Sequence, residues 1–144
     1  MGAANGITSF FAGLARPITR PLFGSSTELP REFLEAFPEL ATARFRRGGL
    51  PVRVGGWCLG QRTVSAITLW RTIWIAPDLS PPVELLLHEF RHVQQFESDV
   101  AFPLRYLWQS LRHGYVNNRY EVDARAYAAD RVREGPDAHP ERMR

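Results

Sequence analysis

His88-Glu89-Phe90-Arg91-His92 forms the pattern HExxH, in which two histidines lie four residues apart and a glutamate follows the first. On an α-helix, positions i and i+4 lie on the same face one turn apart, so both imidazoles can reach one metal ion. Glu89 then lies beside the open coordination position, where a carboxylate serves as general base. The pattern is typical of hydrolytic zinc sites. Because three fixed letters also occur by chance, the surrounding sequence has to decide.

The residues around the motif predict a buried helix over 82–98. Its apolar side chains cover more than half of the circumference: Val83, Leu85, Leu86, Leu87, Phe90 and Val93. Polar groups are costly in such a helix unless they have partners. Metal coordination supplies a partner for both histidines, whereas the alternative is a pair of core histidines bonded to backbone carbonyls. The glutamate between them favours the metal.

A zinc site needs a third protein ligand, and the candidates are Glu121, Asp123, His113 and Asp99. Helices are predicted over 100–114 and over 119–134, the second capped by Asn117-Asn118. Glu121 is the best candidate because small alanines on its helix allow a close approach to the motif helix. However, Glu121 also completes a capping box with Asn118, in which its carboxylate accepts from a backbone N–H. The residue pattern alone leaves these two roles of Glu121 open.

The residues before the motif predict a helical segment followed by strands. Over 27–47 we expect a short helix broken at Pro38, then a turn or second short helix up to Arg46-Arg47. Residues 50–76 are interpreted as strands, because apolar residues alternate over 50–54 and β-branched and aromatic residues follow over 63–75. Whether the later stretch is a hairpin or one long strand stays open. The fold class expected is α+β, with a small antiparallel sheet preceding a helical core.

Composition bounds the class of protein. The 144 residues are 44% apolar and 23% charged, which is typical of one globular domain with a core. The 18 basic residues are all arginine and are interleaved with 15 acidic residues, giving a net charge of only +3. This balance favours a solvated surface over a phosphate-binding patch, so no nucleic-acid partner is expected. The sequence does not set the oligomeric state.

The two ends of the chain differ from the middle. Residues 1–26 contain no acid, two arginines and an apolar patch at Phe10-Phe11, and the charge follows this patch instead of preceding it as in a secretory signal. We expect either a flexible segment or a basic amphipathic segment that touches an anionic membrane surface. Residues 27–134 are expected to form one domain and residues 135–144 a disordered tail. No apolar run reaches transmembrane length, and a cytoplasmic location, with or without membrane association, is expected.

The stretch HEFRHVQQ followed by NRYEVDARAYA resembles the small bacterial gluzincin-type domains, including the minigluzincin-type HExxHxxQ families, many of them uncharacterised. The stretch ITLWRTIWIAP before the motif is similar as well, and the likeness covers roughly residues 60–130. It implies a zincin-like core in which a short sheet precedes the HExxH helix and a later helix supplies a glutamate. It also implies His88, His92 and Glu121 as zinc ligands and Glu89 as the base. One departure is Arg125, where larger gluzincins have an aspartate.

The function expected is that of a zinc metallopeptidase acting on a polypeptide, with Glu89 as general base. The edge of a strand over 72–75 would hold the substrate by backbone pairing. Candidates for stabilising the oxyanion or contacting substrate are Tyr115, Tyr120, His113 and Arg125. Gln95 either bonds a ligand or substrate, or is an exposed helix residue. The alternative function is a zinc-binding or structural protein without turnover, in contact with a membrane surface through residues 1–26.

Overall fold

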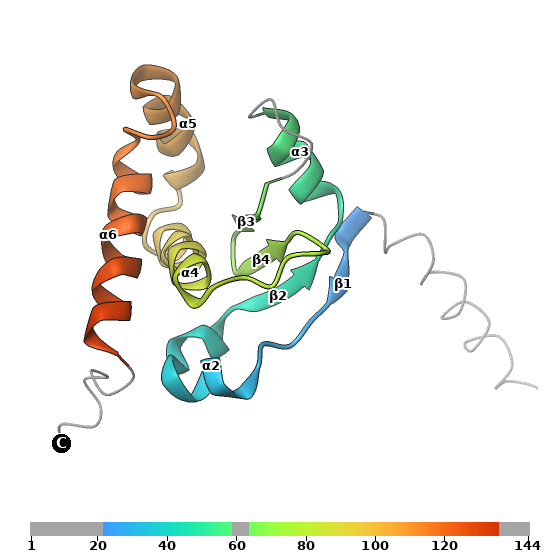
Figure 1. Ribbon diagram of the computed structural model, residues 1–144. Helices are drawn as coiled ribbons and strands as arrows, with labels where there is room; N and C mark the ends of the chain where they lie inside the picture. The colour runs from blue at the N-terminus through green and yellow to red at the C-terminus, as the bar shows by residue number, and fades with distance from the viewer. Residues whose placement is uncertain (1–21, 59–63, 136–144) are drawn as a thin grey trace, which may run out of the picture.

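The computed structural model describes residues 22–58 and 64–135, and their arrangement in layers is seen in Figure 1. A four-stranded sheet forms the first layer. Helix α4 (Val83–Ser98), which carries the HExxH motif, packs against this sheet, and α6 (Arg119–Glu134) packs on the other side of α4. The expected α+β class is confirmed, and the helices expected over 82–98 and 119–134 are present.

The sheet is mixed, whereas an antiparallel one was expected. Its strand order is β1 (Ser25–Ser26), β2 (Arg44–Arg47), β4 (Thr72–Ile75) and β3 (Ala66–Leu69). β3 and β4 form an antiparallel hairpin, but β2 and β4 are parallel because the chain between them returns through α3 (Leu50–Cys58) and β3. The described part of the stretch expected over 63–75 is therefore a hairpin, with strands over 66–69 and 72–75 and a turn at Trp70-Arg71. β4 lies inside the sheet, so the expectation of a free edge at 72–75 was wrong.

The strand expected from the alternation of Leu50, Val52 and Val54 is a helix, α3. A strand would bury all three side chains on one face, but only Val52 is buried and the other two are exposed. Pro51 is compatible with helix because it lies in the first turn. Gly55 lets α3 approach β3 closely, since a Cβ there would lie 3.1 Å from a side-chain atom of Ile67. Tertiary packing on β3 thus outweighs the local pattern.

The helical segment expected up to Arg46-Arg47 ends earlier. α2 (Arg31–Ala36) and the 3-10 helix η1 (Pro38–Thr42) agree with the predicted break at Pro38, but residues 44–47 form β2. Arg44 to Arg47 pair in register with Thr72 to Ile75 of β4. Only Phe45 among these four residues is buried, so the sequence has too few inward positions for a strand period to be visible.

The core lies between the sheet and α4 and continues to α6. Ile73 and Ile75 of β4 are buried in one cluster with the apolar face of α4, which contributes Leu86, Leu87, Phe90 and Val93. On the far side of α4, Ala124 and Ala128 of α6 are also buried. Since alanine adds little bulk, α6 comes close to α4, as expected from its composition. This close approach brings the start of α6 beside the HExxH motif.

Helix α5 (Phe102–His113) connects α4 to α6 and ends at Gly114, close to the predicted span of 100–114. Within residues 22–58 and 64–135, no helix is long and apolar enough to cross a membrane. Residues 1–21 and 136–144, most of the two terminal segments set apart above, lie outside the described residues. Ser25–Ser26, which had been grouped with residues 1–26, pair with β2 and belong to the sheet.

Candidate metal centre

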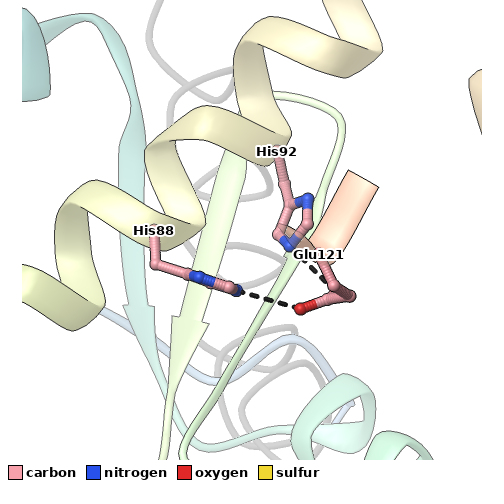
Figure 2. A group of neighbouring side chains, drawn as sticks. All are labelled: His88, His92 and Glu121. Atoms are coloured by element: carbon pink, nitrogen blue, oxygen red, sulfur yellow. Dashed lines mark ion pairs between the residues drawn. The ribbon is translucent and has the colours of Figure 1, made fainter. Parts of the chain in front are cut away.

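The two histidines of the motif converge on Glu121. In Figure 2 both imidazoles leave α4 on the same side and meet the carboxylate at the start of α6. Nε2 of His88 lies 3.2 Å from Oε2 of Glu121, and Nε2 of His92 lies 3.2 Å from Oε1. These separations are close to the ~3.3 Å between ligands of a tetrahedral zinc ion with bonds of about 2.0 Å. The three side chains can therefore hold one metal ion.

The first turn of α6 frees Glu121 from a capping role. Asn118 is the N-cap residue, and its side-chain oxygen accepts from the backbone N–H of Tyr120. Its amide donates to the Tyr106 carbonyl and to Ser110 Oγ, so the cap is also fixed to α5. Glu121 instead points at the histidines, and the question left open by the sequence is decided against the capping box.

The tautomer of His92 is set by Gln95. The Gln95 amide nitrogen donates to the Tyr120 carbonyl and to the Asp123 carboxylate, both of which can only accept. The Gln95 oxygen therefore faces His92 Nδ1 at 2.8 Å and accepts its hydrogen. In the neutral ring this leaves Nε2, the atom beside Glu121, with a free lone pair for a metal. Gln95 is buried, so the alternative of an exposed helix residue was wrong.

Charge at the cluster favours a bound cation. Burial by itself raises the pKa of Glu121, but the adjacent imidazoles of His88 and His92 and the Tyr106 hydroxyl hold it well below its ordinary value. Burial lowers the pKa of His92, yet Glu121 and Glu89 outweigh this and raise it. Oε2 of Glu121 is fully buried, and apart from its 3.2 Å contact with His88 Nε2 it has no hydrogen-bond partner among the described residues. A metal ion would satisfy that oxygen and both Nε2 atoms together, so the residues present fit the group.

Glu89 is buried beside the cluster and is held by the sheet. The hydroxyl of Thr68 on β3 lies 2.7 Å from Glu89 Oε2 and donates to it. Since this bond uses one carboxylate oxygen, the other can still accept a proton. Glu89 is therefore fixed between α4 and β3 with one carboxylate oxygen that Thr68 does not engage.

Tyr106 is a member of the site that the sequence did not reveal. Its hydroxyl donates to Glu121 Oε1 at 2.6 Å, and its ring packs edge-on against His92 with centroids 6.0 Å apart. Burial and the Glu121 carboxylate raise the pKa of Tyr106, so it stays a donor. The available signal was its place four residues after Phe102, on the inward face of α5, because a tyrosine on a buried face needs a partner for its hydroxyl.

The remaining candidates for contact with the oxyanion or substrate differ in what their side chains touch. Burial and the nearby Glu121 carboxylate raise the pKa of Tyr115, whose side chain is also exposed enough to meet a substrate. Arg125 Nη1 lies 4.0 Å from Glu121 Oε2. Tyr120 packs its ring on Phe102, and its hydroxyl accepts from Arg119. His113 is exposed at the end of α5.

Two of the four candidate third ligands have other roles. Asp123 accepts from Arg91 and Gln95, and the Arg91 guanidinium holds its pKa below the ordinary value. Its carboxylate therefore supports the site through Gln95 and does not reach the metal position. Asp99 accepts from the Ala101 backbone N–H and pairs with Arg105 at the start of α5. The described metal-ligand cluster comprises only His88, His92 and Glu121.

Comparison with known proteins adds no further constraint on the site. The chain matches no protein-family model, no curated protein and no solved structure.

Proposed function

We propose that the protein is a zinc-dependent metallopeptidase. The observation that carries the proposal is the meeting of His88, His92 and Glu121 beside a buried glutamate that follows the first histidine. Three protein ligands leave a coordination position for water or substrate, as in catalytic zinc sites. A site built only for structure more often fills all four positions with protein atoms.

A zinc ion bound here would lower the pKa of a water molecule and polarise a carbonyl oxygen. With such an ion bound, Glu89 would accept a proton from the attacking water and later return it to the leaving amine. Thr68 keeps the Glu89 carboxylate oriented while it changes protonation state, and Gln95 and Tyr106 orient His92 and Glu121. Tyr115 is the favoured oxyanion donor because it lies near the Glu121 carboxylate and its side chain is open to solvent.

The edge of β3 supports a polypeptide as the substrate. β3 is the terminal strand of the described sheet, and Ala76 N–H bonds to the Ser65 carbonyl. With this register, the outward N–H and C=O groups belong to Ala66 and Thr68. An extended peptide added at this edge would run past the residue that holds Glu89. The substrate edge thus proposed is β3 and not the 72–75 strand.

The test compares Glu89→Gln with His88→Ala in the full chain. Glu89→Gln should retain about one zinc per chain and lose cleavage of a quenched-fluorescence peptide library by roughly 100-fold or more, because the base is gone and the ligands are intact. His88→Ala should lose both zinc and cleavage. Glu84→Gln, an exposed glutamate in the first turn of the same helix, is the matched control and should change neither.

A zinc-binding domain without turnover is the second candidate, and Arg125 is the observation that favours it. An arginine 4.0 Å from a ligand carboxylate competes with the metal for the same charge. That candidate expects zinc in the wild-type chain but no cleavage of any library peptide. Glu89→Gln would then be indistinguishable from wild type in every assay, which separates the two functions.

A further inference from the structure

Helix α5 has two apolar sides, only one of which faces the body of the protein. Its inward side carries Phe102, which is buried against Phe96 with ring centroids 4.6 Å apart, and Tyr106, which reaches Glu121. In Figure 1, α5 lies at one end of the molecule, above α4. Its other side is free in the described part of the chain.

The outward side forms a continuous stripe of large apolar residues, named here the α5 stripe. Its members are Leu104, Leu107, Trp108 and Leu111, which are 74%, 56%, 61% and 76% exposed. The spacing i, i+3, i+4, i+7 puts all four on one helical face. Val100 and Val116, at the two ends of the helix, extend the apolar surface and are also exposed. Several large apolar side chains gathered in this way mark an interaction surface.

The charges around the α5 stripe indicate its partner. Residues 100–120 contain three arginines and no acidic residue. Arg105 and Arg112 are seven residues apart, so they flank the stripe on one side, next to Trp108. Arg105 is paired with Asp99, while Arg112 is exposed at the end of the helix. An apolar helix face with Trp, bordered by arginine on a helix that itself carries no acidic residue, complements an anionic lipid surface.

We propose that α5 is a membrane-docking helix, whose stripe enters the interface of an anionic bilayer while Arg105 and Arg112 meet the headgroups. Arginine side chains suit this geometry because their stems lie along apolar surface and their guanidinium groups reach the phosphates. Tyr106 faces Glu121 from the opposite side of the same helix, so docking holds the metal centre within about one helix diameter, ~10 Å, of the bilayer surface.

The experiment is flotation of the full chain with vesicles of phosphatidylcholine alone or mixed with phosphatidylglycerol. Wild type should float with the mixed vesicles and only weakly with the neutral ones. Leu107→Glu combined with Leu111→Glu should reduce the bound fraction at least tenfold, and Arg112→Gln should reduce it about fivefold. Val54→Glu combined with Val132→Glu adds the same charge at exposed apolar positions of α3 and α6 and should bind as wild type.

Folding and oligomeric state are checked on the same samples. The stripe residues are exposed, so the double variant should keep the wild-type thermal unfolding temperature and zinc content. Binding that is unchanged in the double variant would overturn the proposal, including the case in which residues 1–21 carry it. So would the absence of vesicle binding, or a wild-type dimer in sedimentation velocity that the double variant splits, because a second copy would then be the occupant.

Discussion

The Gln95 amide links the ligand His92 to an acid and a carbonyl of α6. Its nitrogen bonds Asp123 and the Tyr120 carbonyl, and its oxygen accepts from His92 Nδ1. We predict that Gln95→Leu weakens zinc binding by about 10- to 100-fold, since the imidazole loses the partner that fixes its orientation. Competition with a chromophoric chelator measures the affinity. Gln94→Leu, which changes the neighbouring amide that bonds Arg91, is the control; equal affinities for the two variants would contradict the prediction.

The hydroxyl of Tyr106 has a separable role from its ring. The hydroxyl donates to Glu121 Oε1, while the ring packs against Phe102 and Tyr120. Tyr106→Phe removes only the donor, so we predict zinc affinity reduced by roughly tenfold with the fold intact. The predicted loss of unfolding free energy is about 1 kcal/mol.

Isothermal titration with zinc and urea unfolding measure the two effects of Tyr106→Phe. Tyr127→Phe removes a hydroxyl from a partly buried tyrosine of α6 outside the ligand cluster, and should leave zinc affinity unchanged. A Tyr106→Phe protein that binds zinc as tightly as wild type would show that the phenol is only a packing residue.

At the scale of elements, the sequence predicted those that carry their own signals. α4 has a wide apolar face, α5 is followed by Gly114, and α6 begins at a capping asparagine, so each could be found without knowing its neighbours. α3 and β2 could not, because each has a single buried position among the side chains that the structure describes, Val52 in α3 and Phe45 in β2. An element with one inward-facing residue shows no hydrophobic periodicity in its sequence.

The residues of the candidate site also differ in whether a local sequence pattern predicts them. His88 and His92 are one turn apart on one helix, so local geometry brings them together, and the glutamate ligand was expected from a resemblance. Thr68 and Tyr106 contact the site only because β3 and α5 pack against α4 and α6. Their roles depend on tertiary contacts between segments far apart in sequence, which a pattern of residue types does not encode.

The contact between α6 and α4 depends on small side chains. Ala124 is fully buried one turn after Glu121. We predict that Ala124→Leu pushes α6 away from α4, lowers the free energy of unfolding by about 2 kcal/mol and weakens zinc binding as Glu121 moves. Ala126→Leu makes the same change on the exposed face of α6 and should affect neither. Urea unfolding and zinc titration of both variants give the comparison, and equal behaviour would refute the idea of a tight helix contact.

At the scale of the whole molecule, a largely buried ion pair ties the two ends of the fold together. Arg131 of α6 lies 2.8 Å from Glu39 of η1, and the two side chains are 11% and 14% exposed. The Arg131 guanidinium also stacks over the Phe37 ring, 5.2 Å from its centroid. The pair joins the end of α6 to the segment between β1 and β2, so it stabilises the arrangement of layers and not any single helix.

We predict that Arg131→Met lowers the free energy of unfolding by about 3 kcal/mol, because Glu39 is left buried without its partner. Arg133→Met, two residues further on, removes an exposed guanidinium that pairs with Asp130 and should cost less than about 0.5 kcal/mol. Thermal and urea unfolding measure both. A loss in Arg131→Met as small as that in Arg133→Met would mean that the layers are held by apolar packing alone.

The three candidate metal ligands come from two separate helices, so the time at which the site forms depends on the order of synthesis. The paired imidazoles leave the ribosome before the carboxylate, which follows about 30 residues later, beyond α5. A growing polypeptide therefore offers only two ligands to a metal ion until α6 has been made and has folded back onto α4. Loading of the proposed metal would be delayed until that moment, and proteolytic removal of α6 would release the ion even if the motif stayed whole.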